Sequence, residues 1–206
     1  MRWRVIITLS VMLLTACGDD VPAYPNLTTA FVNVRISSGQ HEHWMQTDDG
    51  SQYAFTSQCD LNDFVRDSLY RVVCRYELLD ARNAKVYAIA QTLSSEPQRQ
   101  TDYRTDPVKV QSIWQSGPYL NMVLEVMVHD VRHDFGFAVE QIDSTNMRII
   151  LCHDRRVDIE GFYEKVYASV PLSPYAEWLN KGNALEFCIN TSDGMQSYVV
   201  KPFNQM

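Results

Sequence analysis

A long alternation of apolar and polar side chains constrains the fold of this chain more than any other feature. Leu120, Met122, Leu124, Val126 and Val128 form one apolar row, and mostly polar or half-exposed positions lie between them. Successive side chains of a β-strand point to opposite faces, so this row predicts a strand with one buried face. The same alternation, rich in β-branched and aromatic residues, recurs along most of the chain. The sequence therefore predicts an all-β protein.

The strands fall into two groups, separated by the polar segment 94–106. About five short strands precede this segment, which would suit a small OB-like β-barrel, and six or seven follow it, which would suit an antiparallel β-sandwich. We place the first domain at 29–103 and the second at 104–206, with 94–106 as the linker. A short helix is expected at 173–181, with Ser173 as its cap.

The start of the chain has the layout of a bacterial lipoprotein signal. Two arginines precede a short apolar run that ends in Leu14-Thr15-Ala16-Cys17. The run is too short to span a bilayer, which takes ~20 apolar residues, and it fits a cleavable signal over 1–16. The thiol of Cys17 would then carry the lipid, and 17–28 would be an acidic tether. The alternative is an ordinary secretory signal with an incidental cysteine.

Charge limits the partners that this chain can bind. The formal net charge is -7, and there is no basic run. Binding to phosphate backbones or to anionic lipid needs positive charge, so we exclude nucleic acid and electrostatic membrane docking. The lipid itself would hold the protein to the membrane, and we place it in the bacterial cell envelope, at the outer membrane.

Four further cysteines follow Cys17, namely Cys59, Cys74, Cys152 and Cys188. An even number in an oxidising compartment permits two disulfides. Spacing favours Cys59–Cys74 and Cys152–Cys188, each within one half of the chain. The alternative is a set of buried thiols, since Cys74 lies on the apolar face of its strand.

The sequence contains no recognisable catalytic motif. It lacks a G-x-S-x-G elbow, an S-x-x-K set, an HExxH motif and a phosphate-binding glycine loop. The histidines and their acidic neighbours are the candidate metal ligands, but their spacing is more typical of polar residues at strand ends and turns. We therefore predict no catalytic residue, no metal and no cofactor. These candidate ligands are His41, His43, His129, His133, His153, Asp130, Asp134 and Asp154.

Aromatic side chains are the better candidates for binding. Trp44 and Tyr53 lie in the first domain, where OB barrels commonly present stacking side chains to oligosaccharides or oligonucleotides. The alternative is that they belong to the barrel core. Trp178 lies in a second aromatic-rich region with Tyr163, Tyr167, Tyr175 and Phe203, and this region could face a partner.

One block of sequence connects the chain with a known family. The segment Asp106-Pro107-Val108-Lys109, followed by Ile113-Trp114 and by Gly117-Pro118-Tyr119-Leu120-Asn121, resembles the NigD-like lipoproteins, as do the lipidation signal, Asp48-Asp49-Gly50 and the strand 70–79. The resemblance covers nearly the whole mature chain. It implies an N-terminal OB-type domain and a C-terminal β-sandwich, and it supplies no catalytic residue. The family's link to a bacteriocin operon makes an immunity or accessory role conceivable.

Together these observations predict a lipid-anchored binding or accessory protein of the cell envelope without catalytic activity. Its expected partner is another envelope protein or a peptide. The alternatives are bacteriocin immunity, saccharide binding through the first domain and, last, an unrecognised hydrolase.

Overall fold

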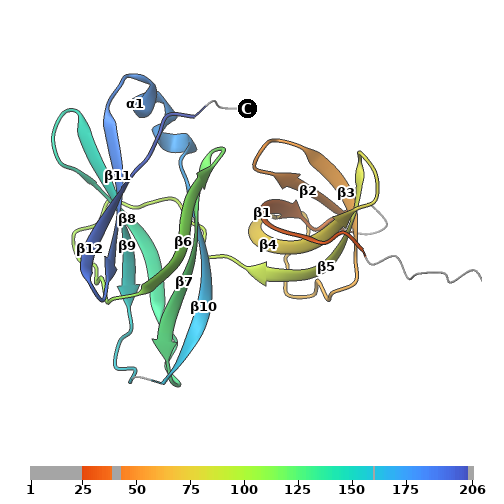
Figure 1. The fold of residues 1–206 in the computed structure, drawn as a ribbon, viewed down its shortest axis with the longest axis horizontal. Coiled ribbons are helices and arrows are strands. Elements are labelled where there is room, and N and C mark those ends of the chain that lie inside the picture. Colours follow the sequence, from red (N-terminus) through yellow and green to blue (C-terminus); the bar gives the residue numbers. More distant parts are fainter. Residues whose placement is uncertain (1–24, 39–42, 160, 204–206) are drawn as a thin grey trace, which may run out of the picture.

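The computed structural model describes residues 25–38, 43–159 and 161–203, and Cys17 with most of the predicted tether lies outside them. Figure 1 shows two β bodies side by side, joined by a single crossing of the chain. The smaller body is a closed barrel with the strand order β1-β2-β3-β5-β4. Its strands are β1 (Thr28–Arg35), β2 (His43–Thr47), β3 (Gln52–Ser57), β4 (Leu69–Leu78) and β5 (Asn83–Gln91).

The larger body is a sandwich of two sheets. One sheet has the order β10-β7-β6 and the other β12-β11-β9-β8. Their strands are β6 (Lys109–Ser116), β7 (Tyr119–Val128), β8 (Asp134–Gln141), β9 (Asn146–Asp154), β10 (Phe162–Pro171), β11 (Ala184–Thr191) and β12 (Gly194–Val199). The all-β prediction is confirmed. The pairing is not wholly antiparallel, because β9 and β11 pair in parallel, after the chain has crossed through β10 in the opposite sheet.

The apolar row that predicted β7 forms the sandwich core. Leu120, Met122, Leu124 and Val126 are buried, and Phe137, Ile149, Leu185 and Phe187 of the second sheet belong to the same cluster. The barrel has its own core, which includes Val32, Met45, Val72 and Val86. Each domain thus buries a separate apolar cluster, as independently folded domains do.

The polar segment predicted as a linker lies along the sandwich. Leu93 pairs in parallel with Ala168 of β10, Gln98 with Ala138 of β8, and Thr105 with His153 of β9. The segment therefore crosses from the edge of one sheet to the edge of the other. Sequence patterns missed this, because single bridges leave no alternation in the side chains.

A buried arginine joins the two bodies. Arg71 of β4, 9% exposed, forms an ion pair of 2.6 Å with Asp48 and donates hydrogen bonds to Ser169 and Asn121 of the sandwich, at 3.1 and 3.0 Å. Its guanidinium lies 3.8 Å from the centre of the Tyr119 ring. All three nitrogens of this buried charge thus meet a partner, which offsets the cost of its desolvation.

The expected helix at 173–181 is present in two parts. A 3-10 turn, η1 (Ser173–Tyr175), leads into α1 (Ala176–Asn180). Ser173 is the first residue of the turn rather than its cap, and the capping position is occupied by Leu172. No helix in the described part of the chain is long and apolar enough to cross a membrane.

Candidate functional site at the tip of the sandwich

Two loops form the end of the sandwich where β7 and β10 meet, at the bottom of Figure 1. The first loop, 129–133, joins β7 to β8, and the second, 155–161, joins β9 to β10. We call these two loops, with the first residues of β10, the tip. The loops at the ends of a sandwich carry the binding sites of many β proteins, because rigid strands position them.

Asp158 holds the two loops together. Its carboxylate accepts the backbone N–H of His129 at 2.8 Å, those of Asp130 and Val131 at 3.3 Å and its neighbour Ile159 at 3.1 Å. These N–H groups, His129 first, hold the pKa of Asp158 far below its ordinary value. A carboxylate of the second loop thus closes the backbone of the first.

A pair of buried histidines continues this network into the sandwich. His133 Nε2 lies 3.1 Å from Asp158 Oδ2, and His133 Nδ1 lies 2.9 Å from His153 Nε2. His153 Nδ1 lies 2.9 Å from the carbonyl of Asp106, and the ring stacks on Phe135. His133 and His153 are only 8% and 2% exposed. A chain of contacts therefore runs from Asp158 to the segment 104–106.

The partners fix which outer ring nitrogen carries a proton. A carbonyl only accepts, so His153 Nδ1 donates to it, and the carboxylate of Asp158 accepts from His133 Nε2. Burial is the main cause that lowers the pKa of His153.

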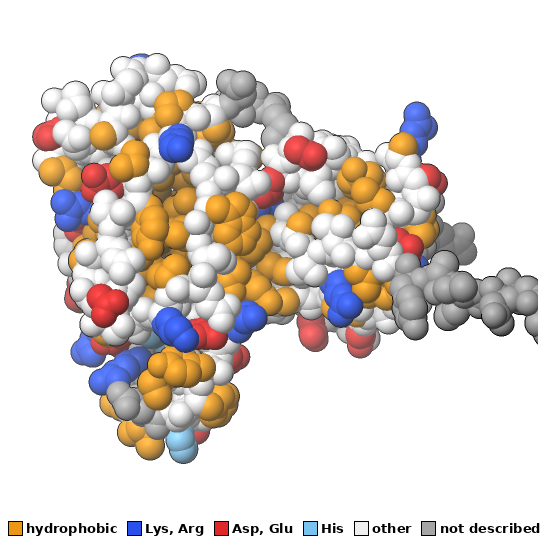
Figure 2. Space-filling model, in the orientation of Figure 1, with side chains coloured by type: hydrophobic (Ala, Val, Ile, Leu, Met, Phe, Trp, Pro, Cys, Tyr) orange, Lys and Arg blue, Asp and Glu red, His pale blue; other side chains and the backbone are white. Residues whose placement is uncertain are grey.

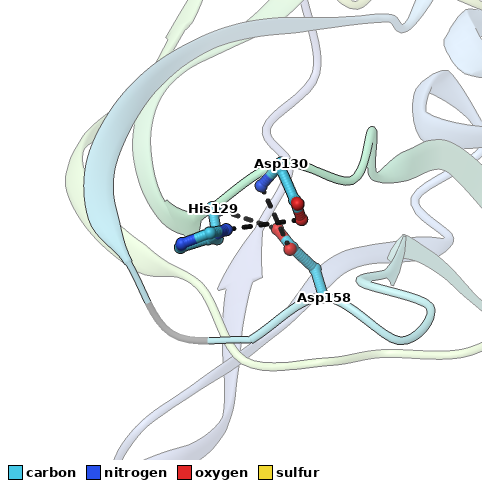
Figure 3. A group of neighbouring side chains, drawn as sticks. All are labelled: His129, Asp130 and Asp158. Carbon is cyan, nitrogen blue, oxygen red and sulfur yellow. Dashed lines mark hydrogen bonds and ion pairs between the residues drawn. The ribbon is translucent and has the colours of Figure 1, made fainter.

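A candidate cation site is formed by His129, Asp130 and Asp158, whose ligand atoms lie within 4.8 Å of one another (Figure 3). Asp158 is already bound by four backbone N–H groups and by His133. A carboxylate offers about four lone-pair sites, so none is free for a metal ion. The geometry indicates a structural clasp.

The tip exposes four large apolar side chains beside charged ones such as Asp130 and Arg156. Val157 is 85% exposed, Phe162 63%, Ile159 62% and Tyr163 57%. Figure 2 shows apolar side chains gathered at this end of the molecule. Behind these side chains, Gly161 lies so close to the end of β7 that a Cβ on it would be 2.2 Å from the carbonyl oxygen of Val128. The tip therefore presents apolar groups on a backbone that is held from within.

The aromatic residues predicted from the sequence do not converge. Tyr53 pairs with Met45 and packs against the barrel core, whereas Trp44 lies on the other face of the same hairpin, 5.8 Å from the Arg35 guanidinium. Trp178 belongs to α1 in the other domain and donates to the carbonyl of Ala184. Their role in binding stays a prediction. Among the residues of the second aromatic region, only Tyr163 lies at the tip.

All four described cysteines carry free thiols in this structure. Cys59 packs against the core that contains Cys74, and burial, followed by the neighbouring Cys59, raises the pKa of Cys74 to about 12. Cys152 and Cys188 share a small cluster of the sandwich. The predicted partners are therefore neighbours, and the two disulfides stay a prediction.

The histidines divide into two groups. His41 lies outside the described residues, and His43 accepts the backbone N–H of Ser37 at 3.2 Å. His129, His133 and His153 meet at the tip. Asp158, Val157 and Ile159 were missed, because a loop without periodicity gives no signal.

Comparison with known proteins agrees with the fold. A family model described as the NigD-like C-terminal beta sandwich domain matches residues 90–202, more than half of the chain. The chain belongs to the NigD-like family. The NigD-like sandwich begins at the end of β5 in this match, so it includes the segment 92–108 that lies along the two sheets.

Solved NigD-like and related structures cover both domains. A NigD-like immunity protein from Bacteroides caccae is 25% identical, with a TM-score of 0.67 over 86% of this chain and 93% of its own. A protein from Parabacteroides distasonis, provisionally described as toxin-related, is 21% identical, with a TM-score of 0.68 over 86% and 94%. A protein from Bacteroides fragilis, described as a lipoprotein, is 10% identical, with a TM-score of 0.54 over 88% and 99%. No curated protein matches the sequence significantly.

Proposed function

We propose that this NigD-like chain is a lipid-anchored binding protein of the bacterial cell envelope, and that the tip of its sandwich contacts a protein partner. The observation that carries the proposal is the group of exposed apolar side chains at the tip, namely Val157, Ile159, Phe162 and Tyr163. Exposed apolar side chains gathered at one end of a folded domain commonly mark an interaction site. Saccharide binding through the first domain has less support, since Tyr53 packs against the barrel core and Trp44 lies on the other face of the same hairpin.

The clasp behind the tip suits a binding role. Asp158 and His133 fix both loops before any partner arrives, so association costs less ordering of the backbone. The same contacts explain why we propose no catalysis by this cluster. Its ionisable groups are buried and bonded to one another.

The anchor would confine the tip to a membrane surface. Cys17 is the proposed lipid attachment, and two or three acyl chains suffice for stable anchoring. Confinement raises the local concentration of the tip toward partners in the same membrane. Cys17→Ser should move the folded protein into the soluble fraction and abolish its activity, and a soluble variant with full activity would contradict the role of the anchor.

Immunity is the more specific candidate, favoured by the NigD-like immunity protein from Bacteroides caccae, which is 25% identical. In this case the bound partner would be a toxic peptide or protein. Deletion of the gene should sensitise cells to one member of a bacteriocin panel. Wild type should restore survival, Val157→Ser with Ile159→Ser should not, and the control Val199→Ser, at an exposed site on β12, should. Unchanged survival across the panel would contradict immunity.

A further inference from the structure

The edge of β10 next to the tip is open. β10 lies at the end of its sheet and pairs with β7 alone over Phe162–Pro171. On its outer edge the chain's own Leu93 forms one parallel bridge, in which Leu93 donates to the carbonyl of Tyr167 and accepts from the N–H of Ser169, at 2.8 and 2.9 Å. The chain's own segment at Leu93 therefore pairs with this edge of β10 at one position and not along the rest of the strand.

The remaining edge positions follow from the alternation of the backbone. In a strand, the N–H and C=O groups of every second residue point to the same side. Because Tyr167 and Ser169 point toward Leu93, the backbone groups of Lys165 and Tyr163 point to the same outer edge. No hydrogen bond from any described residue reaches them there. Four backbone groups in a row thus stand unpaired.

A groove lies along these groups. It has a volume of about 1000 Å³, and its walls include β10 from Glu164 to Tyr167 on one side and the segment from His129 to Phe135 on the other. Val126, Val128 and Leu93 contribute apolar surface, and charged side chains such as Asp130, Arg156 and Glu164 line much of the rest. An extended chain paired with the β10 edge would lie beside this groove.

Edge strands are commonly protected by an inward charge, a proline or a bulge. Two charged side chains lie on this part of β10: Glu164 lines the groove, and Lys165 stands opposite Glu125 on the outer face of the sheet. Lys109 and, more weakly, Lys165 lower the pKa of Glu125. The Lys165 charge therefore interacts with Glu125 on the outer face of the sheet rather than at the open edge of β10.

We propose that an extended segment of the partner protein adds as a strand to the outer edge of β10, continuing the pairing that Leu93 begins. Main-chain bonds to Tyr163 and Lys165 would supply the register, and alternate apolar side chains would enter the groove against Val126 and Val128. This inference rests on the proposed binding function, and it specifies the chemistry of the partner as an extended segment with apolar residues at every second position.

The test uses a capped hexapeptide of alternating valine and threonine with the folded mature chain. On binding, hydrogen exchange of the Tyr163 and Lys165 amides should slow at least about tenfold, while exchange along the β6 and β12 edges stays unchanged. Two N-methylated peptides provide the matched control, one methylated on the valines and the other on the threonines. One should fail and the other should bind, since only one set of N–H groups can face β10.

Three results would overturn strand addition. They are absence of binding at about 1 mM peptide, equal binding of both methylated peptides, and protection at another sheet edge. Protection of Tyr163 and Lys165 without peptide, with a doubled molecular mass, would instead show that a second copy covers the edge. If the peptide does not bind but a crosslink from Val157 to the partner still forms, strand addition alone is contradicted. If the crosslink from Val157 does not form either, the proposed function is contradicted.

Discussion

At the scale of single residues, one carboxylate organises the candidate site. Asp158 is 6% exposed, yet it is bound by four backbone N–H groups and by His133. Removing this carboxylate is costly, because buried donors would be left without their acceptor. The order of the tip therefore depends on Asp158 more than on any exposed residue.

Replacing Asp158 tests this dependence. Asp158→Asn removes the negative charge and turns an NH2 group toward backbone donors, so the melting temperature should fall by roughly 5 °C or more. Asp130→Asn is the matched control, since the Asp130 side chain is 74% exposed. Thermal unfolding of both variants measures the difference, and equal melting temperatures would contradict the clasp.

The histidine pair predicts a pH dependence. Burial, then the charge of His133, lowers the pKa of His153 below its ordinary value of 6.5. As the pH falls, His153 therefore takes up a proton in the unfolded chain before it does so in the folded chain. The contribution of His153 to the free energy of unfolding is present above about pH 6.5 and is lost as the pH falls. The lowered pKa of Asp158 adds a further loss below its ordinary value of 3.8.

Urea unfolding of wild type and His153→Gln between pH 7.5 and 5 tests the first of these losses. The glutamine side chain can accept a hydrogen bond from His133 and donate one to the carbonyl of Asp106 without titrating. The free energy of unfolding of the variant should therefore fall less than that of wild type over this pH range. His129→Gln, at a half-exposed side chain, serves as control and should keep the wild-type slope. The same slope in all three proteins would refute the assignment.

At the scale of elements, the periodic strands were predictable and the aperiodic segments were not. The sequence placed a strand at 69–79 where β4 runs from Leu69 to Leu78, and its apolar row from Leu120 to Val128 lies in β7. The segment 92–108 and the loop 155–161 could not be predicted, because their structure comes from backbone pairing and from contacts with residues far away in the sequence. Of the four exposed apolar residues at the tip, only Tyr163 had a signal, from its aromatic neighbours in the sequence.

The approach of the two tip loops gives a prediction at this scale. Gly161→Ala would place a Cβ 2.2 Å from the Val128 carbonyl oxygen, so the loops must separate, at a cost of about 1–3 kcal/mol. Gly136→Ala in β8 meets nothing within 4 Å and should be close to neutral. Urea unfolding compares the two, and a neutral Gly161→Ala would show that the loops are not held in contact.

At the scale of the whole molecule, Arg71 couples the barrel to the sandwich. It joins Asp48 of the barrel to Ser169 and Asn121 of the sandwich across an otherwise small contact that includes the edge-to-face pair of Phe31 and Trp114. We expect such a junction to make the two separate cores unfold as one unit. The resemblance to the NigD-like family implied both domains, but no pattern in the sequence marked this arginine as buried.

Arg71→Met should destabilise the protein by about 3–5 kcal/mol, because it leaves Asp48 buried without its partner. Calorimetry should then resolve two transitions where wild type shows one. Arg75→Met, on the same strand but exposed, is the control and should keep the single transition. A single, unshifted transition for Arg71→Met would mean that other contacts join the domains.

The central claim, that the tip binds a protein partner, is tested most directly by photo-crosslinking in intact cells. A photoreactive residue at Val157 or Ile159 should give one discrete adduct, and the same residue at Val199 or Val65, which are 70% and 67% exposed, should give none. The adduct should disappear with Asp158→Asn, which loosens the loops. Adducts of equal yield at all four positions, or none at Val157 and Ile159, would contradict the account.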